Sequence, residues 1–304
     1  MKLILTFAFL LSPLLLFAQE REATSLLGTP LYRPQLEDKT REDFEAKLAK
    51  AVSDYEKAPD DPEASIWLGR RMAYLGRYRE AIAIYSRSLE RHPGAAQLYR
   101  HRGHRYLTVR QMDHAIQDLE KAAALMQGKQ DEIEPDGIPN AKNIPTSTLN
   151  TNIFYHLGLA YYLKEDYQHA EKAYRECLKF SKNDDMLVAT THWLYMTLRR
   201  MGKQKEAGAL LLPIHGSMNI IEDFDYLSLC LLYKKEKKPE EMLSSLETQD
   251  LSGATISYGV GNWYLYNGEK EKAMEIFKKI LSGNEWASFG YLAAEAELAR
   301  LEKK

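Results

Sequence analysis

A regular spacing of small residues limits what this chain can fold into. Glycine is followed twelve positions later by alanine at Gly69 and Ala81, at Gly103 and Ala115, and at Gly158 and Ala170. The first two alanines are 34 residues apart, and the next step of 55 residues equals one such repeat plus 21 inserted residues. Self-similarity at a fixed period of this length predicts an array of stacked units that share one continuous core.

The residues between these markers follow a helical period. Apolar side chains recur at three- and four-residue spacing, so each helix carries one buried stripe. Because glycine disfavours a helix interior, its recurrence needs a packing reason. We expect Gly69, Gly103 and Gly158 to lie against the small alanines of the second helix and to let the two helices approach closely.

The full pattern resembles the tetratricopeptide repeat (TPR), a helix–turn–helix unit of 34 residues. The motifs that carry the resemblance are Leu68-Gly69-x-x-Met72 with Tyr78-x-x-Ala81-x-x-x-Tyr85, Gly103-x-x-Tyr106 with Met112-x-x-Ala115-x-x-x-Leu119, and Leu157-Gly158-x-x-Tyr161 with Tyr167-x-x-Ala170-x-x-x-Tyr174. Weaker copies follow around Leu194 and Ala207, around Tyr226 and Met242, and around Gly261 and Ala273. We therefore predict an all-α, right-handed α-solenoid of about six TPR-like repeats over residues 61–304.

Flanking helices are expected at both ends of the array. Residues 40–60 form the first, with Phe44, Leu48, Ala51 and Tyr55 on one apolar stripe. Residues 285–302 form a closing helix that covers the last apolar face of the solenoid, with Glu295 and Arg300 in water. Residues 19–39 are predicted to be an extended segment.

The first eighteen residues have the character of a secretory signal. One cation, Lys2, precedes a mainly apolar stretch without charges that ends at Ala18. Its short length and the interruption by Pro13 argue against a retained membrane span. We expect cleavage near Ala18, a periplasmic or secreted and possibly envelope-associated protein, and no integral membrane span afterwards. The chain has only two cysteines, Cys177 and Cys230, which we interpret as buried free thiols rather than a disulfide.

The insertion at residues 128–150 breaks the helical period. Its three prolines and two glycines up to Pro145 predict a loop. Loops of this length are commonly functional. We expect Ile133, Ile138 and Ile144 to pack the loop onto the array, at one end of its groove.

Composition narrows the function classes. Apolar residues make up 45% and charged residues 28% of the chain, which excludes disordered and membrane-embedded classes. Its net charge of −2 argues against binding nucleic acid through bulk positive charge. The sequence contains no Gly-x-Ser-x-Gly motif and no phosphate-binding glycine-rich loop, and His101 and His104 have no carboxylate or cysteine at ligand spacing. We expect no enzyme activity, no cofactor and no metal.

The resemblance places a binding groove on the concave side, lined by the first helix of each unit. The candidate groove residues are Arg70, Arg100, His104, Asn152, Tyr155, Tyr162, His192, Arg199, Tyr258 and Asn262. Proteins of this family commonly bind extended peptides, and by resemblance Arg70, Arg100, His104 and Asn152 are candidates to hold a carboxylate. Tyrosines supply aromatic anchors for a partner.

Two functions follow from this interpretation. The first is a non-enzymatic protein–protein interaction scaffold that binds a peptide or partner protein in the concave groove. The alternative is a small-molecule or glycan binder in which residues 128–150 form a lid over Tyr155 and Tyr162.

Overall fold

The computed structural model describes residues 20–243 and 251–301, and it is helical apart from one short hairpin. The predicted signal segment 1–18 lies outside the described residues. Strands β1 (Arg21–Thr24) and β2 (Pro30–Tyr32) pair antiparallel and precede the helices. The helices, in chain order, are α1 (Asp38–Lys57), α2 (Pro62–Tyr74), α3 (Tyr78–Arg91), α4 (Ala96–Thr108), α5 (Met112–Met126), α6 (Leu149–Leu163), α7 (Tyr167–Phe180), α8 (Asp184–Arg200), α9 (Gln204–Leu210), α10 (Phe224–Tyr233), α11 (Pro239–Met242), α12 (Leu251–Tyr266), α13 (Lys270–Leu281) and α14 (Phe289–Leu301).

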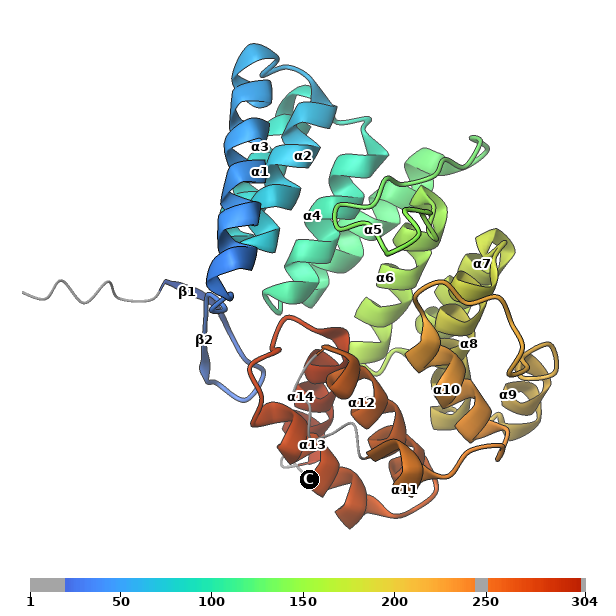
Figure 1. The fold of residues 1–304 in the computed structure, drawn as a ribbon. Helices are drawn as coiled ribbons and strands as arrows, with labels where there is room; N and C mark the ends of the chain where they lie inside the picture. The colour runs from blue at the N-terminus through green and yellow to red at the C-terminus, as the bar shows by residue number, and fades with distance from the viewer. Residues whose placement is uncertain (1–19, 244–250, 302–304) are drawn as a thin grey trace, which may run out of the picture.

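The helices form the predicted all-α array of repeats (Figure 1). Helices α2/α3, α4/α5, α6/α7, α8/α9 and α12/α13 pack as pairs, and the short α11 follows α10. In chain order these are called units 1 to 6 here, with α10/α11 as unit 5, α1 before them and α14 after them. The first flanking helix covers residues 38–57 instead of 40–60. The last begins at Phe289 instead of residue 285, and residue 302 lies outside the described part.

The glycines of the repeat allow close helix packing, but their neighbours differ from those expected. A Cβ atom at Gly69 would lie 2.3 Å from the ring of Tyr85 and one at Gly158 would lie 2.6 Å from the ring of Tyr174. Gly103 faces Leu119 and Gly261 faces Phe277 in the same way. The expected glycine–alanine contact is therefore corrected: a large side chain, four residues after the alanine, fills the space that glycine leaves.

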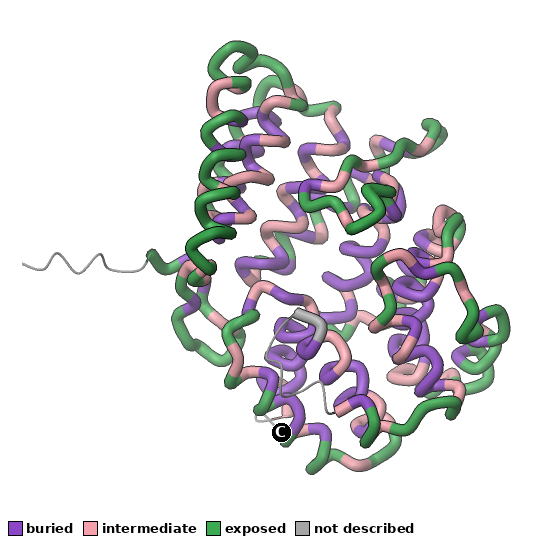
Figure 2. Tube along the Cα trace, in the orientation of Figure 1, coloured by how far each residue is buried: buried purple, intermediate pink, exposed green. Residues whose placement is uncertain are grey.

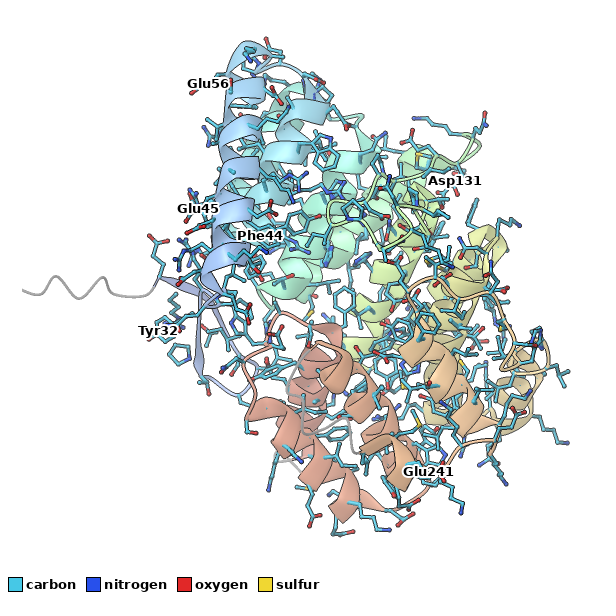
Figure 3. The ribbon with its side chains drawn as sticks, in the orientation of Figure 1. Tyr32, Phe44, Glu45, Glu56, Asp131 and Glu241 are labelled. Carbon is cyan, nitrogen blue, oxygen red and sulfur yellow. The ribbon has the colours of Figure 1, made fainter. Side chains whose placement is uncertain are left out.

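The first flanking helix is amphipathic as predicted. Leu48 and Ala51 are buried and Phe44 packs against Tyr74 of α2, with ring centroids 5.9 Å apart. In Figure 3, Phe44 points toward α2, whereas Glu45 and Glu56 point away from the array. Burial of this stripe ties α1 to unit 1.

The closing helix α14 lies inside the array rather than on its surface. Its residues from Gly290 to Ala299 are buried on every side (Figure 2). Glu295 is completely buried and accepts a hydrogen bond of 2.6 Å from the backbone N–H of Leu26. The expectation that Glu295 and Arg300 face water is therefore wrong: Glu295 is buried, and Arg300, half-buried, donates to the carbonyl of Leu163 at the end of α6.

Contacts between the two ends close the array. The indole N–H of Trp286 donates to the carbonyl of Tyr32 at 2.9 Å, and its ring meets Tyr78 edge-on. Phe289, the first residue of α14, packs against His104 of α4 and His156 of α6. As a result, α14 fills the part of the concave side that an open solenoid would expose.

Candidate functional site

Three first helices, α2, α4 and α6, pack side by side and form the inner face of units 1 to 3. The segment between α5 and α6, residues 127–148, crosses this face, and we call it the strap (Figure 1). Asp131, labelled in Figure 3, lies near the start of the strap and accepts a hydrogen bond of 3.0 Å from the backbone N–H of Asn150. The predicted loop 128–150 is thus observed as an ordered crossing segment.

Acidic side chains of the strap meet the polar side chains of α4. Glu132 accepts a hydrogen bond of 2.6 Å from the amide of Gln97. Glu134 forms an ion pair of 2.9 Å with Arg100, and both side chains are about nine-tenths buried, with 11% and 9% exposed. His101 lies 3.7 Å from the same carboxylate oxygen. The strap thereby supplies a carboxylate to Arg100, one of the residues that were predicted to hold one.

The strap continues from α4 to α2. The guanidinium of Arg71 donates to the carbonyl of Gly137 at 2.8 Å. A Cβ atom at Gly137 would lie only 1.7 Å from the hydroxyl of Tyr74, so a side chain at this position would have to push the end of the Tyr74 side chain aside. Burial, and then the charge of Glu222, raise the pKa of the Asp136 carboxyl, while attraction to Arg70 partly lowers it. Arg70 itself lies over the ring of Trp67, 4.5 Å from its centroid.

The far end of the strap is fixed to units 3 to 5. The side-chain amide of Asn183 donates to the carbonyl of Thr146 at 2.7 Å, and the Thr146 hydroxyl donates to Glu222. Asn152 donates to the hydroxyl of Ser147 at 2.9 Å. A capping box between Thr148 and Thr151 then starts α6.

The isoleucines of the strap do not hold its middle on the array. Ile133, Ile138 and Ile144 are 68%, 57% and 48% exposed, so the expectation that they pack the loop onto the array is wrong. Where the strap meets the inner face, three buried polar atoms have no hydrogen-bond partner: Nε of Arg100, Oε2 of Glu134 and Oδ2 of Asp136. An unsatisfied buried polar group costs about 1–3 kcal/mol, so the contact is far from optimal.

Neutral histidines lie beside this contact. The rings of His104 and His156 are 4.2 Å apart, and Nδ1 of His156 is 2.5 Å from the carbonyl of Asn152. Burial is the largest cause that lowers the pKa of His101, His104 and His156 well below the usual value, and Arg100 and Arg105 add repulsion. These imidazoles are therefore uncharged and leave the arginines as the cations of the inner face.

A second buried charge cluster supports the start of α10. The carboxylate of Asp185 is completely buried and accepts hydrogen bonds from the backbone N–H groups of residues 221, 222 and 223. Burial, and then the neighbouring charge of Asp185, raise the pKa of Asp223 to about 8. This cluster fixes Glu222, which holds the strap.

The predicted groove residues separate into two groups. Arg70, Arg100, His104 and Asn152 lie on the inner face beneath or beside the strap. Tyr155 is buried next to them, donates to the hydroxyl of Tyr226 at 2.9 Å, and accepts from the indole of Trp193 at 2.7 Å. Only the first group keeps the polar groove character that the sequence indicated.

The second group belongs to the protein core. Tyr162, His192, Tyr258 and Asn262 are each at most 1% exposed, so the prediction that they line an open groove is wrong. Tyr258 donates to the hydroxyl of Tyr162 at 2.9 Å, and Arg199 is half-buried over the ring of Tyr266. The physical reason is that later helices pack onto the first helices: Tyr258 of α12 covers Tyr162, and Tyr226 and Tyr233 of α10 cover His192.

Sequence analysis missed the acidic residues of the strap. Glu132, Glu134 and Asp136 occupy every second position before Gly137. In an extended segment such spacing puts three carboxylates on one side, so this pattern was the available signal.

The comparisons with known proteins agree with the observed helix pairs. Two family models, both described as tetratricopeptide repeat, match residues 68–129 and 152–184. These ranges cover most of the helices of units 1 to 3 and leave out residues 130–148 of the strap. Residues 68–129 and 152–184 therefore match the tetratricopeptide repeat, and the described helices form an all-α solenoid of such units.

Solved structures with similar folds are distant from this chain. They include YrrB, described as a TPR protein with an unusual peptide-binding site, with 19% identity, a TM-score of 0.44 and coverage of 78% of this chain and 95% of that one. MamA has 16% identity, a TM-score of 0.43 and coverage of 66% and 89%. A putative kinesin light chain of Podosopora anserina has 15% identity, a TM-score of 0.43 and coverage of 74% and 94%. Likenesses at this level carry no functional information, and no curated protein matches the chain.

Two further observations concern other predictions. Within residues 20–243 and 251–301, no helix is both long and apolar enough to cross a membrane. Cys177 and Cys230 are free and buried, which confirms that they are separate thiols.

Proposed function

We propose that this protein is a non-enzymatic interaction scaffold that binds an extended acidic segment of a partner protein along the inner face of units 1 to 3. The observation that carries the proposal is the ion pair between Glu134 and Arg100, made by an extended segment that lies across the first helices. The contacts of the strap support this ligand chemistry: Arg100 pairs with a carboxylate and Arg71 donates to a backbone carbonyl, while the charge of Arg70 acts on Asp136.

A rigid inner face favours such binding. The arginines and Gln97 are on helices whose packing is fixed by the repeat core, so they lose little freedom when a segment binds. Arg100 is strongly desolvated, and burial lowers its pKa although Glu134 opposes this. A desolvated guanidinium gains more from a carboxylate than an exposed one, because less screening water lies between the charges.

The lid alternative receives less support. Tyr162 would have to line the enclosed pocket, but it is completely buried between Tyr258, Tyr167 and Trp193. The strap contacts α2, α4 and unit 5, away from the C-terminal end of α6 on which Tyr162 lies.

We also propose that the chain is exported and meets its partner outside the cytoplasm. Support comes from the apolar stretch that ends at Ala18. Sequencing of the N-terminus of the protein recovered from an expressing bacterium tests this: a start close to Gln19 is expected, and an intact Met1 in a cytoplasmic fraction contradicts export.

The binding proposal is tested with a fluorescein-labelled peptide that has the sequence of residues 130–140. Its anisotropy is titrated with the full chain, with Arg70→Glu, and with the control Arg87→Glu on the exposed side of α3. We expect binding that weakens at least tenfold in Arg70→Glu and with rising salt, because the charge near Asp136 of the peptide is reversed. Equal affinity of Arg70→Glu and Arg87→Glu would contradict the proposed face.

A further inference from the structure

We propose that the strap is an internal occupant of this binding face, and that a partner must displace it with a segment of the pattern acid-x-acid-x-acid-Gly. This inference rests on the proposed function and adds both the partner's chemistry and the way its access is regulated. The pattern is that of Glu132 to Gly137 in the chain itself.

The alternation follows from the extended backbone of the strap. Ile133 forms an antiparallel bridge with Thr148, and the N–H of Glu134 donates to the carbonyl of Ser147 at 3.2 Å. Successive side chains of such a segment point to opposite sides. Glu132 and Glu134 therefore turn toward α4 while Ile133 between them is 68% exposed.

The glycine of the pattern follows from the space at α2. Gly137 lies so close to Tyr74 that any side chain would overlap the tyrosine hydroxyl. Its carbonyl accepts the hydrogen bond from Arg71, so the backbone must come this close to be recognised. A partner segment that follows the same path therefore fits best with glycine at the same position, where no side chain displaces Tyr74.

The strap is attached in a way that permits a partner segment to displace its middle. Its two ends are anchored, at Asp131 by Asn150 and at Thr146 by Asn183 and Glu222. Its middle buries charges with orphaned polar atoms and leaves its isoleucines in water. The isoleucines of the middle thus do not hold it on the face, while the anchored ends keep it at high effective concentration as a competitor.

Competition from the strap lowers the apparent affinity for any partner, because only those chains whose face is free can bind it. The apparent affinity equals the intrinsic affinity multiplied by the fraction of such chains. Weakening the middle of the strap should raise that fraction. Two variants do this by different means: Glu134→Gln with Asp136→Asn removes the charges, and Gly137→Ala crowds the contact between the strap and Tyr74 with all charges kept.

The experiment measures the dissociation constant of the labelled 130–140 peptide for the full chain and both variants. The control, Glu271→Gln with Glu275→Gln on the exposed side of α13, removes the same number of charges far from the strap. We expect both strap variants to bind the peptide at least tenfold more tightly than the unmodified chain and the control. We also expect a peptide with Gly137→Ala to bind at least tenfold more weakly than the unmodified peptide.

The outcomes separate the two proposals. If the peptide binds all four proteins with equal affinity, the strap is no competitor and this inference is overturned, whereas the proposed function stands. If the peptide binds none of them, including the strap variants with native circular dichroism, the proposed function fails as well. A peptide with glycine replaced that binds equally well overturns the proposed pattern.

Discussion

Arg110 and Glu295 form an ion pair of 2.7 Å, although 185 residues separate them and their side chains are only 3% and 0% exposed. Arg110 follows α4 and Glu295 lies in the middle of α14. The pair therefore fastens the last helix to the second unit, and Arg110 also donates to the carbonyl of Trp286 at 2.8 Å. Closure of the array at this point fixes the inner face on which the strap lies.

Removal of one partner of this pair should be costly. Glu295→Ala leaves the Arg110 charge buried without its carboxylate, and we expect the free energy of unfolding to fall by about 3–5 kcal/mol. The double variant Arg110→Met with Glu295→Met should recover most of the loss, because it leaves no buried charge. Urea denaturation measures both, and a loss below about 1 kcal/mol in the single variant would show that α14 is not fastened here.

The packing of the repeat glycines gives a second prediction. Gly158→Ala should lower the free energy of unfolding by about 1–3 kcal/mol, because its methyl group overlaps the ring of Tyr174. Gly208→Ala on α9 is the matched control, since nothing lies within 4 Å of its position and alanine favours a helix. It should leave stability unchanged or raise it by up to about 1 kcal/mol. Equal effects of the two substitutions would contradict the packing.

The buried histidines predict a loss of stability in mild acid. The pKa values of His104 and His156 are lowered in the folded protein, so the unfolded chain binds more protons once the pH falls below about 6.5. The free energy of unfolding should therefore decrease between pH 7 and pH 5. Arg70, Arg100 and Arg105 surround these groups and oppose their charging, while Glu134 is the carboxylate nearest to Arg100 and His101.

Asp223 changes the free energy of unfolding in the opposite direction over this pH range, so its effect must be separated from that of the histidines. Its pKa is raised to about 8, so the stability that it contributes is present below about pH 4 and is lost as the pH rises toward 8. The measurement therefore compares urea midpoints at pH 7 and pH 5 for the unmodified chain, for His104→Gln with His156→Gln, and for the exposed control His215→Gln. The double variant should show a smaller acid-induced loss than the other two, and three equal losses would exclude these histidines as its cause.

The two thiols should be unreactive in the folded protein. Burial raises the pKa of Cys177 to about 12, and burial also raises that of Cys230, so neither forms a thiolate near neutral pH. We expect no rapid reaction with a thiol reagent at pH 8, and two equivalents of reaction after denaturation in urea. Rapid labelling of either cysteine in the native chain would contradict its burial.

The sequence predicted the local features of the fold well because these depend on short spacings. The glycine positions, the helix pairs and the inserted segment all repeat or interrupt one period, and Arg70, Arg100 and His104 follow from the helical register. The return of α14 could not be predicted in this way. It rests on contacts such as Trp286 with Tyr32, between residues 254 positions apart.

The burial of Tyr162 and Tyr258 was missed for a related reason. An aromatic stripe on a first helix suits an open groove and a face covered by another helix equally well, so the sequence did not distinguish the two. The acids of the strap were missed because a loop rich in proline has no helical register to place them. Their alternation gains meaning only when the strap is known to be extended and to cross Arg100.

Hydrogen–deuterium exchange of the full chain, with and without the 130–140 peptide, tests most directly whether a bound peptide displaces the strap from the inner face. With saturating peptide, the account predicts faster exchange within residues 132–147 of the protein, because bound peptide displaces the strap and breaks the hydrogen bond from Glu134 to Ser147. Helices α2 and α4 should keep or gain protection. Bound peptide that leaves the exchange of the strap unchanged, or slows it, would contradict the account.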